Sequence, residues 1–218
     1  SDRGWHLADQ FRGQPGCDLY SMHGYPVPAW QPISFDGLTD PLAHALLPFY
    51  CKAARAFGPV MLQEFGPILT LGKQQQDSYL RGMLRPCWDA GANGFLWWCM
   101  RDIPAKVHPY INGAFESVLG LFDVSDNLKP GAEAYIELAR DVANWPDAKM
   151  PTGSDVVGVY WPRNYYPRGG NTYRANQPRE LSARLIAADY MLTSLGRRTR
   201  VVRSDIPLPA PTELGTIL

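Results

Sequence analysis

The sequence has no excess of charge of either sign, no long apolar run and no closely spaced cysteines. Its 21 Lys and Arg residues balance 21 Asp and Glu residues, which excludes the broad electrostatic field that recruits nucleic acid or an anionic membrane. No stretch of roughly 18 apolar residues is present, so we expect no transmembrane helix. The cysteines show neither a C-x-x-C pair nor a Cys/His spacing suited to zinc, so we predict no metal site and no cofactor, and interpret as buried thiols Cys17, Cys51, Cys87 and Cys99.

Aromatic residues, in contrast, are abundant. Seven Trp and 11 Tyr residues offer flat faces of the kind that stack on sugar rings, although packing in the core or at its rim is the alternative for most of them. With balanced charge, a neutral partner is expected. No signal peptide opens residue 1, and the sequence leaves the cellular compartment open.

Short apolar runs alternate with helical patterns over the first two thirds of the chain, which is typical of βα units and a parallel sheet. The apolar run at 94–100 predicts a strand buried on both faces. Asp40 followed by Pro41 predicts the start of a helix. The other predicted strands span 18–23 and 59–65, and the predicted helices span about 40–57, 75–90 and 130–144.

The composition changes near residue 145, where Pro, Gly and Ser become frequent. We therefore predict a first domain at 1–145, a linker at 146–154 and a second domain at 155–218. The second domain is expected to contain a strand, an amphipathic helix, another strand and the start of a third. Three βα units make less than half of a (β/α)8 barrel, so both domains are expected to be incomplete.

Glu64 is the strongest candidate for chemistry. A carboxylate that ends the apolar strand VMLQEF is costly to bury unless it is paired or functional. An outward-facing loop salt bridge is the alternative. In a barrel the catalytic groups come from the carboxyl ends of different strands, where the sequence also places His23, Tyr25, Trp97 and Trp98.

Three segments carry a family resemblance. SMHGYP (21–26), PVMLQEFG (59–66) and GANGFLWWCMRD (91–102) resemble strands six, seven and eight of the clan A glycoside hydrolases, especially family 5 cellulases and mannanases. The segment GLFDVSDNLKPGAEAY (120–135) is similar to the turn before their last helix. The resemblance implies the C-terminal βα units of a TIM barrel and a retaining β-glycosidase, and it favours a β-glucan or β-mannan as the substrate.

The same resemblance implies a role for each candidate residue. Glu64 would be the nucleophile and Tyr25 its hydrogen-bond donor. His23 would contact the substrate or the acid/base, with a structural histidine as the alternative. Trp98 would form the floor of a sugar subsite. Trp97 lies on the opposite side of the strand and would either pack in the core or contact the substrate. Either the outer sugar subsites or the ordinary rim of the barrel would contain Trp30, Arg101, His108 and Tyr110.

Retaining chemistry needs a second carboxyl group about 5 Å from the first. No Asn-Glu pair, the usual context of the acid/base, occurs in this sequence, and Glu116 is expected to be a hydrogen-bonding loop residue. We therefore expect the acid/base to lie upstream and the isolated chain to be inactive. The alternative is a non-catalytic carbohydrate-binding or assembly protein derived from a glycosidase barrel.

The segment from Asp155 to Leu208 resembles the opening of the flavodoxin-like, doubly wound domain that follows the barrel in family 42 β-galactosidases. That likeness favours a β-galactoside as the substrate. It also implies a homo-oligomer, a trimer or dimer, assembled through the C-terminal domain. A nucleotide- or glutamine-using module is the other interpretation of this region, but its Gly169-Gly170 pair is a weak phosphate loop and is better explained as a turn.

Overall fold

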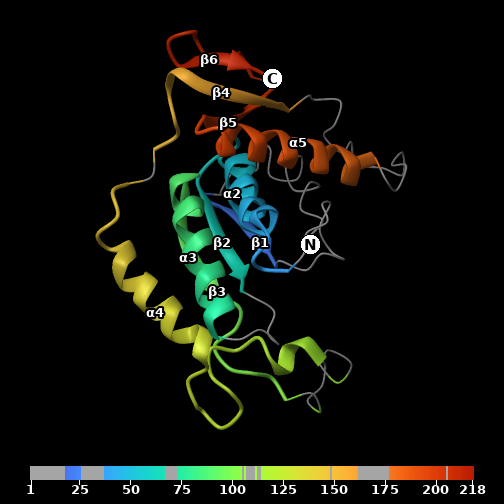
Figure 1. The fold of residues 1–218 in the computed structure, drawn as a ribbon, viewed down its shortest axis with the longest axis vertical. Coiled ribbons are helices and arrows are strands. Elements are labelled where there is room, and N and C mark those ends of the chain that lie inside the picture. Colours follow the sequence, from blue (N-terminus) through green and yellow to red (C-terminus); the bar gives the residue numbers. More distant parts are fainter. Residues whose placement is uncertain are drawn as a thin grey trace.

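The structure of the chain is a computed structural model that describes residues 18–25, 37–66, 73–104, 106, 111, 114–147, 149–161, 177–204 and 206–218. These residues form a mixed α/β fold with two parallel sheets (Figure 1). The first part of the chain contains β1 (Tyr20–Gly24), α2 (Pro41–Arg55), β2 (Val60–Phe65), α3 (Lys73–Asp89), β3 (Ala92–Trp97), the short 3-10 helix η3 (Ala114–Ser117) and α4 (Pro130–Val142). The second part contains β4 (Gly153–Trp161), α5 (Gln177–Ser194), β5 (Arg198–Arg203) and β6 (Leu214–Ile217).

The first sheet is made of parallel strands in the order β1-β2-β3, joined by α2 and α3 as the alternating pattern predicts. Helix α2 begins where expected, because the Asp40 carboxylate accepts a hydrogen bond from the Leu42 backbone N–H at 2.8 Å and Pro41 occupies the first turn. The predicted position of the third strand is wrong by a few residues. β3 ends at Trp97, and residues 98–100 already belong to the loop that follows.

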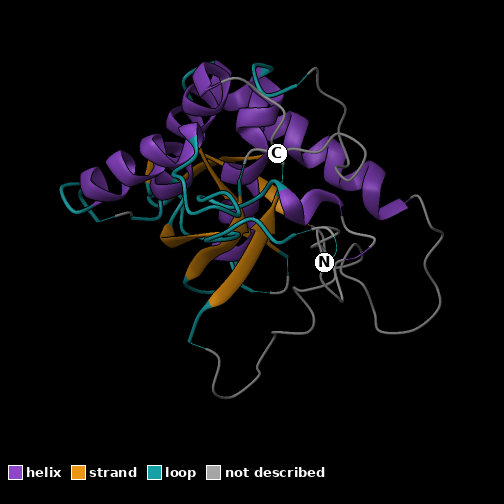
Figure 2. Cartoon of the chain, turned by 90° about the horizontal axis from the view of Figure 1, so that it is seen from below, coloured by secondary structure: helices purple, strands orange, loops and turns teal. Residues whose placement is uncertain are grey.

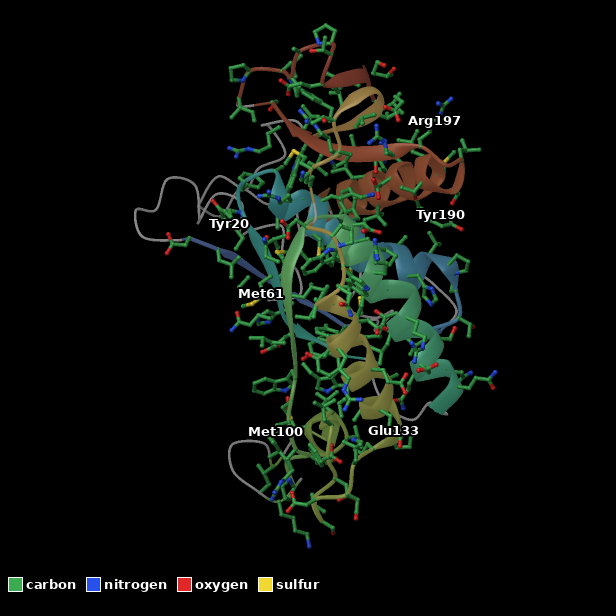
Figure 3. All side chains as sticks on the ribbon, turned by 90° about the vertical axis from the view of Figure 1, so that its left-hand side faces the viewer. Tyr20, Met61, Met100, Glu133, Tyr190 and Arg197 are labelled. Carbon is green, nitrogen blue, oxygen red and sulfur yellow. The ribbon has the colours of Figure 1, made fainter. Side chains whose placement is uncertain are left out.

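Only one face of this sheet is covered among the described residues. Helices α2 and α3 pack on that face, and Figure 2 shows the helices gathered on one side of the strands. Met61 lies on the side of the strands away from α3 and α4 (Figure 3). The prediction that the third strand is buried on both faces is therefore wrong, since Leu96 is 51% exposed. The covered face carries Met22, Val60, Leu62 and Ala92, and the open face carries Ser21, Met61, Gln63 and Leu96.

The second sheet has the order β5-β4-β6, again with parallel pairing. The predicted strand, helix, strand and start of a third strand are all present. Gly196 has φ of 73°, in the left-handed region that ends a helix and favours glycine. The prediction that Leu195 faces the core is wrong. Leu195 is 75% exposed, because it lies beyond the last turn of α5.

The two sheets share one hydrophobic core, since the main cluster of buried residues includes members of both. Helix α5 lies against α2 (Figure 1). At this contact the Lys52 ammonium donates to both carboxylate oxygens of Asp189, at 3.0 and 2.9 Å, and to the Thr199 hydroxyl at 2.7 Å. The rings of Phe57 and Trp161 meet edge to face nearby. The C-terminal unit thus packs on the helix that supports β1 and β2.

Candidate active site

The carboxyl ends of β1 and β2 bring His23 and Glu64 together. The strands are adjacent and parallel, and the register pairs His23 with Glu64 after an irregularity between Met22 and His23. His23 Nδ1 lies 3.0 Å from Glu64 Oε2, with the two side chains 31% and 26% exposed. Both groups are therefore accessible while remaining in contact with each other.

Tyr25 reaches the same carboxylate from the residue after β1. Its hydroxyl donates to Glu64 Oε2 at 3.5 Å, and its side chain is buried, with 5% of the residue exposed. Both donors thus bind one oxygen, Oε2, and neither of these contacts engages Oε1. Two contacts at one oxygen orient the carboxylate and leave Oε1 outside both of them.

Trp97, at the end of β3, packs inside the protein. Its ring meets Phe65 at a centroid distance of 5.7 Å and Tyr135 of α4 at 5.3 Å. Its indole N–H donates to the Leu119 carbonyl at 2.8 Å. Of the two roles expected for Trp97, these contacts agree with packing between β3 and α4.

Trp98 has different partners. Its backbone N–H donates to the Phe65 carbonyl at 3.4 Å, which extends the β2–β3 pairing by one residue. Its indole N–H donates to Glu116 Oε2 at 2.9 Å. Glu116 therefore does accept a hydrogen bond, as expected, but its partner is the very tryptophan proposed to contact substrate. Sequence reasoning missed this pairing, because the two residues belong to a strand end and a distant part of a long loop.

A partly buried ion pair, Asp102 with Lys129, lies in the loop after β3. Asp102 is 7% exposed and its Oδ1 accepts from Lys129 Nζ at 2.8 Å and from the Gly120 N–H at 2.7 Å. Lys129 also donates to the Val118 carbonyl at 2.6 Å. A Cβ on Gly120 would lie 2.2 Å from the Asp102 backbone nitrogen, so only glycine fits there. These contacts tie Asp102 and Lys129 to residues 118 and 120 of the same loop.

The thiol next to Trp98, that of Cys99, is held in its protonated form. Burial, with a smaller effect from the Glu116 carboxylate, raises the pKa of Cys99. Its S–H donates to the Arg101 carbonyl at 3.0 Å. Cys51 and Cys87 are buried as predicted, whereas Cys99 is only partly buried. Cys17 lies outside the described residues.

Arg101, a predicted subsite residue, forms an ion pair with Asp126 at the surface, where its side chain is 55% exposed. This contact ties Arg101 to the loop and does not bring it to Glu64. The other predicted rim residues, Trp30, His108 and Tyr110, lie outside the described residues. Within the described ranges no group of three or more His, Cys, Asp or Glu side chains could hold a metal ion, and no helix there is long and apolar enough to cross a membrane.

Comparisons with known proteins point to one class of enzyme. No family model matches the chain, and no curated protein matches it either. Among solved structures, the exo-β-1,4-mannosidase Op5Man5 from Opitutaceae bacterium strain TAV5 is 51% identical in sequence, with a TM-score of 0.79. The similarity covers 94% of this chain and 36% of that chain, so the present chain spans about a third of the mannosidase.

Two further structures share the fold. GH5_18 from Bifidobacterium longum subsp. longum, in complex with Manβ1-4GlcNAc, is 23% identical with a TM-score of 0.65, over 86% of this chain and 43% of that one. GH5_18 from Streptomyces cattleya, in complex with the same disaccharide, is 18% identical with a TM-score of 0.61, over 91% and 54%. The structural neighbours are thus family 5 glycoside hydrolases, that is, enzymes that cleave O-glycosyl bonds.

The same comparisons bear on the C-terminal unit. The 6% of this chain left uncovered by the mannosidase amounts to about 13 of its 218 residues, far fewer than residues 155–218 contain. The similarity to the mannosidase therefore extends into the second sheet. The expected likeness to a family 42 flavodoxin-like domain finds no support here, and the predicted trimer or dimer rested on that likeness.

Proposed function

We propose that this chain is part of a retaining β-glycosidase whose nucleophile is Glu64. The observation that carries the proposal is the contact of one Glu64 oxygen with His23 and Tyr25 at the carboxyl ends of adjacent parallel strands. Catalytic groups of (β/α)8 enzymes occupy this edge of the sheet. The similarity to a mannosidase at 51% identity supports the same conclusion.

The proposed reaction has two displacements. Glu64 Oε1 attacks the anomeric carbon, the bond to the leaving oxygen breaks, and an acid group protonates that oxygen. Water then gives up a proton to the same acid/base group, attacks the anomeric carbon, and releases Glu64 as a carboxylate. Tyr25 and His23, which hold Oε2, keep Oε1 aimed at the sugar and stabilise the negative charge before attack and after release.

The acid/base residue is proposed to come from outside these 218 residues. Among the described residues the first sheet has three strands, where a barrel has eight. Its open face carries half-buried and exposed side chains such as Met61 and Leu96. The remaining strands of a barrel would cover this face and bring a second carboxyl group to within about 5 Å of Glu64.

A β-mannoside is the proposed substrate. Among the sugars that the sequence left open, it is the one named for the 51% identical neighbour. Trp98 supplies the flat surface for the sugar ring in this proposal, because Trp97 is packed against Phe65 and Tyr135. Arg101 and Trp30 remain proposed contacts of the outer subsites.

Azide rescue tests the proposal. In the full-length enzyme, Glu64→Ala should lower kcat for an activated aryl β-mannoside by a factor on the order of 10⁴ or more. Added azide should restore turnover and give the α-mannosyl azide, because only one inversion then occurs. Glu133, exposed in the first turn of α4, provides the control, and Glu133→Ala should retain full activity. Sugar binding by the unsubstituted enzyme without any turnover would instead favour the non-catalytic carbohydrate-binding alternative.

A further inference from the structure

We infer that Glu116 is a positioning residue that sets the orientation of the Trp98 indole and thereby shapes the floor of the sugar subsite. The inference rests on the proposed function, because it takes Trp98 to be the surface on which the sugar ring stacks. It assigns a role to a residue other than the nucleophile and its hydrogen-bond donors. It starts from one contact, the 2.9 Å hydrogen bond from Trp98 Nε1 to Glu116 Oε2.

The geometry of this contact suits a stacking residue. An indole N–H lies in the plane of the ring, so its acceptor sits at the edge and leaves both faces free of that contact. Nε1 is also remote from the backbone, so holding it restricts rotation of the whole side chain. A hydrogen bond at this atom therefore fixes the plane of Trp98 without occupying the surface that a sugar ring would use.

Glu116 is itself held in place. Its backbone carbonyl accepts from the Ile103 N–H at 2.8 Å. Three residues later, the Leu119 carbonyl accepts from the Trp97 indole and from the Cys99 N–H. The paired side chains of Asp102 and Lys129 bond to the backbone at Gly120 and Val118. The acceptor for Trp98 is therefore part of a segment bonded back to residues 97–103.

The two adjacent tryptophans, Trp97 and Trp98, donate to different kinds of acceptor, and this difference is informative. Trp97 donates to a backbone carbonyl in a packed position, which is sufficient for a core residue. Trp98 donates to a side-chain carboxylate, and a charged acceptor binds an N–H more strongly than a neutral one does. The stronger acceptor is placed on the indole that has to keep its plane when a sugar arrives and leaves.

If the carboxylate acts through Trp98, its loss should reduce stacking in the transition state without removing any group that reacts. We expect Glu116→Ala to lower kcat/KM for an aryl β-mannoside about tenfold, which corresponds to about 1.4 kcal/mol. Glu116→Gln should remain within about threefold of the unsubstituted enzyme, because the amide oxygen still accepts from Nε1. If the negative charge of Glu116 had only a structural role, Glu116→Gln would lose activity as Glu116→Ala does.

A double-mutant cycle in the full-length enzyme provides the decisive measurement. Trp98→Phe keeps a flat ring but has no N–H, so adding Glu116→Ala to it should change kcat/KM by less than about twofold. An equal loss with Trp98 or Phe at position 98 would overturn the inference, as would a Glu116→Ala enzyme with unchanged kcat/KM. Thermal unfolding of each variant and of the Glu133→Ala control reports on folding separately.

Binding experiments separate this inference from the proposed function. The same cycle can be measured as the affinity for β-1,4-mannobiose in a Glu64→Gln background, where no turnover is needed. If the unsubstituted enzyme hydrolyses no glycoside but the cycle shows coupling in binding, the proposed function fails and the role of Glu116 stands. If mannobiose binds and Glu116→Ala leaves its affinity unchanged, the role of Glu116 fails. Absence of any mannobiose binding overturns both.

Discussion

Removal of the Asp189 carboxylate should destabilise the junction between the two sheets more than any single surface change. Asp189 lies on α5 with its side chain 4% exposed, and its partner Lys52 on α2 is 14% exposed. Both carboxylate oxygens accept from Lys52, and Oδ1 also accepts from the Thr199 hydroxyl at 2.5 Å. Asp189→Ala therefore leaves a buried ammonium without its counter-ion.

The magnitude follows from this burial. Loss of one partner of a buried ion pair typically costs about 3–5 kcal/mol. For a cooperative unit the size of this chain, each kcal/mol lowers the melting temperature by about 2–4 °C. We therefore expect Asp189→Ala to lower the Tm by about 10 °C. The loss should be largely reversed when Lys52→Met and Asp189→Leu are combined, because apolar side chains of similar size then fill the site.

Circular dichroism of the full-length protein during heating measures this effect. Asp77→Ala is the matched control, since Asp77 pairs with Arg81 at the surface with side-chain exposures of 37% and 43%, and its Tm should change by less than about 2 °C. Equal shifts for Asp189→Ala and Asp77→Ala would refute the reasoning that burial makes the Lys52–Asp189 pair important. So would a combined variant no more stable than Asp189→Ala alone.

Four further predictions concern the site and the core. Trp98→Ala should lower kcat/KM by roughly tenfold through lost stacking, and an unchanged value would remove Trp98 from the subsite. Gly120→Ala should cost about 1–3 kcal/mol in urea unfolding, because its Cβ would lie 2.2 Å from the Asp102 backbone; a neutral effect would show that the loop can shift. Burial raises the pKa of Tyr79 and Cys87, so both stay protonated in the folded protein when the unfolded chain ionises, and stability should fall as pH rises above about 8.5. Among the described residues the Tyr79 hydroxyl has no hydrogen-bond partner, so Tyr79→Phe should raise stability by about 1 kcal/mol and weaken this alkaline loss; an unchanged pH dependence would contradict it.

The helices and most strands were predictable because their signals are local. The inward side chains of α3, such as Leu80 and Met83, recur at helical spacing and are fully buried. Asp40 caps α2 as its position before Pro41 predicts. The burial of β3 was not predictable in the same way. An apolar run indicates a strand, but whether Leu96 is covered depends on which elements pack over it.

In the candidate site, too, the contacts set by strand register could be predicted, and the contacts set by a long loop could not. His23 and Glu64 were expected to meet because parallel strands end at one edge of a sheet, and the register between β1 and β2 places them together. The ion pair of Arg101 with Asp126 and the hydrogen bond of Trp98 with Glu116 depend on the path of a long loop. No periodic pattern specifies such a path, so neither contact could be derived from spacing.

Different parts of the fold hold the two parts of the candidate site. The proposed nucleophile and its donors are positioned by strand register, which the shared core fixes through α2 and its contacts with β1 and β2. The plane of Trp98 is proposed to be positioned by the loop after β3, where Glu116 accepts from Trp98 and Asp102 accepts from Gly120 and Lys129. Substitutions in that loop can therefore alter how a sugar ring is held without moving Glu64. Changes of sugar preference should accordingly map to the loop after β3, and changes that abolish turnover should map to the ends of β1 and β2.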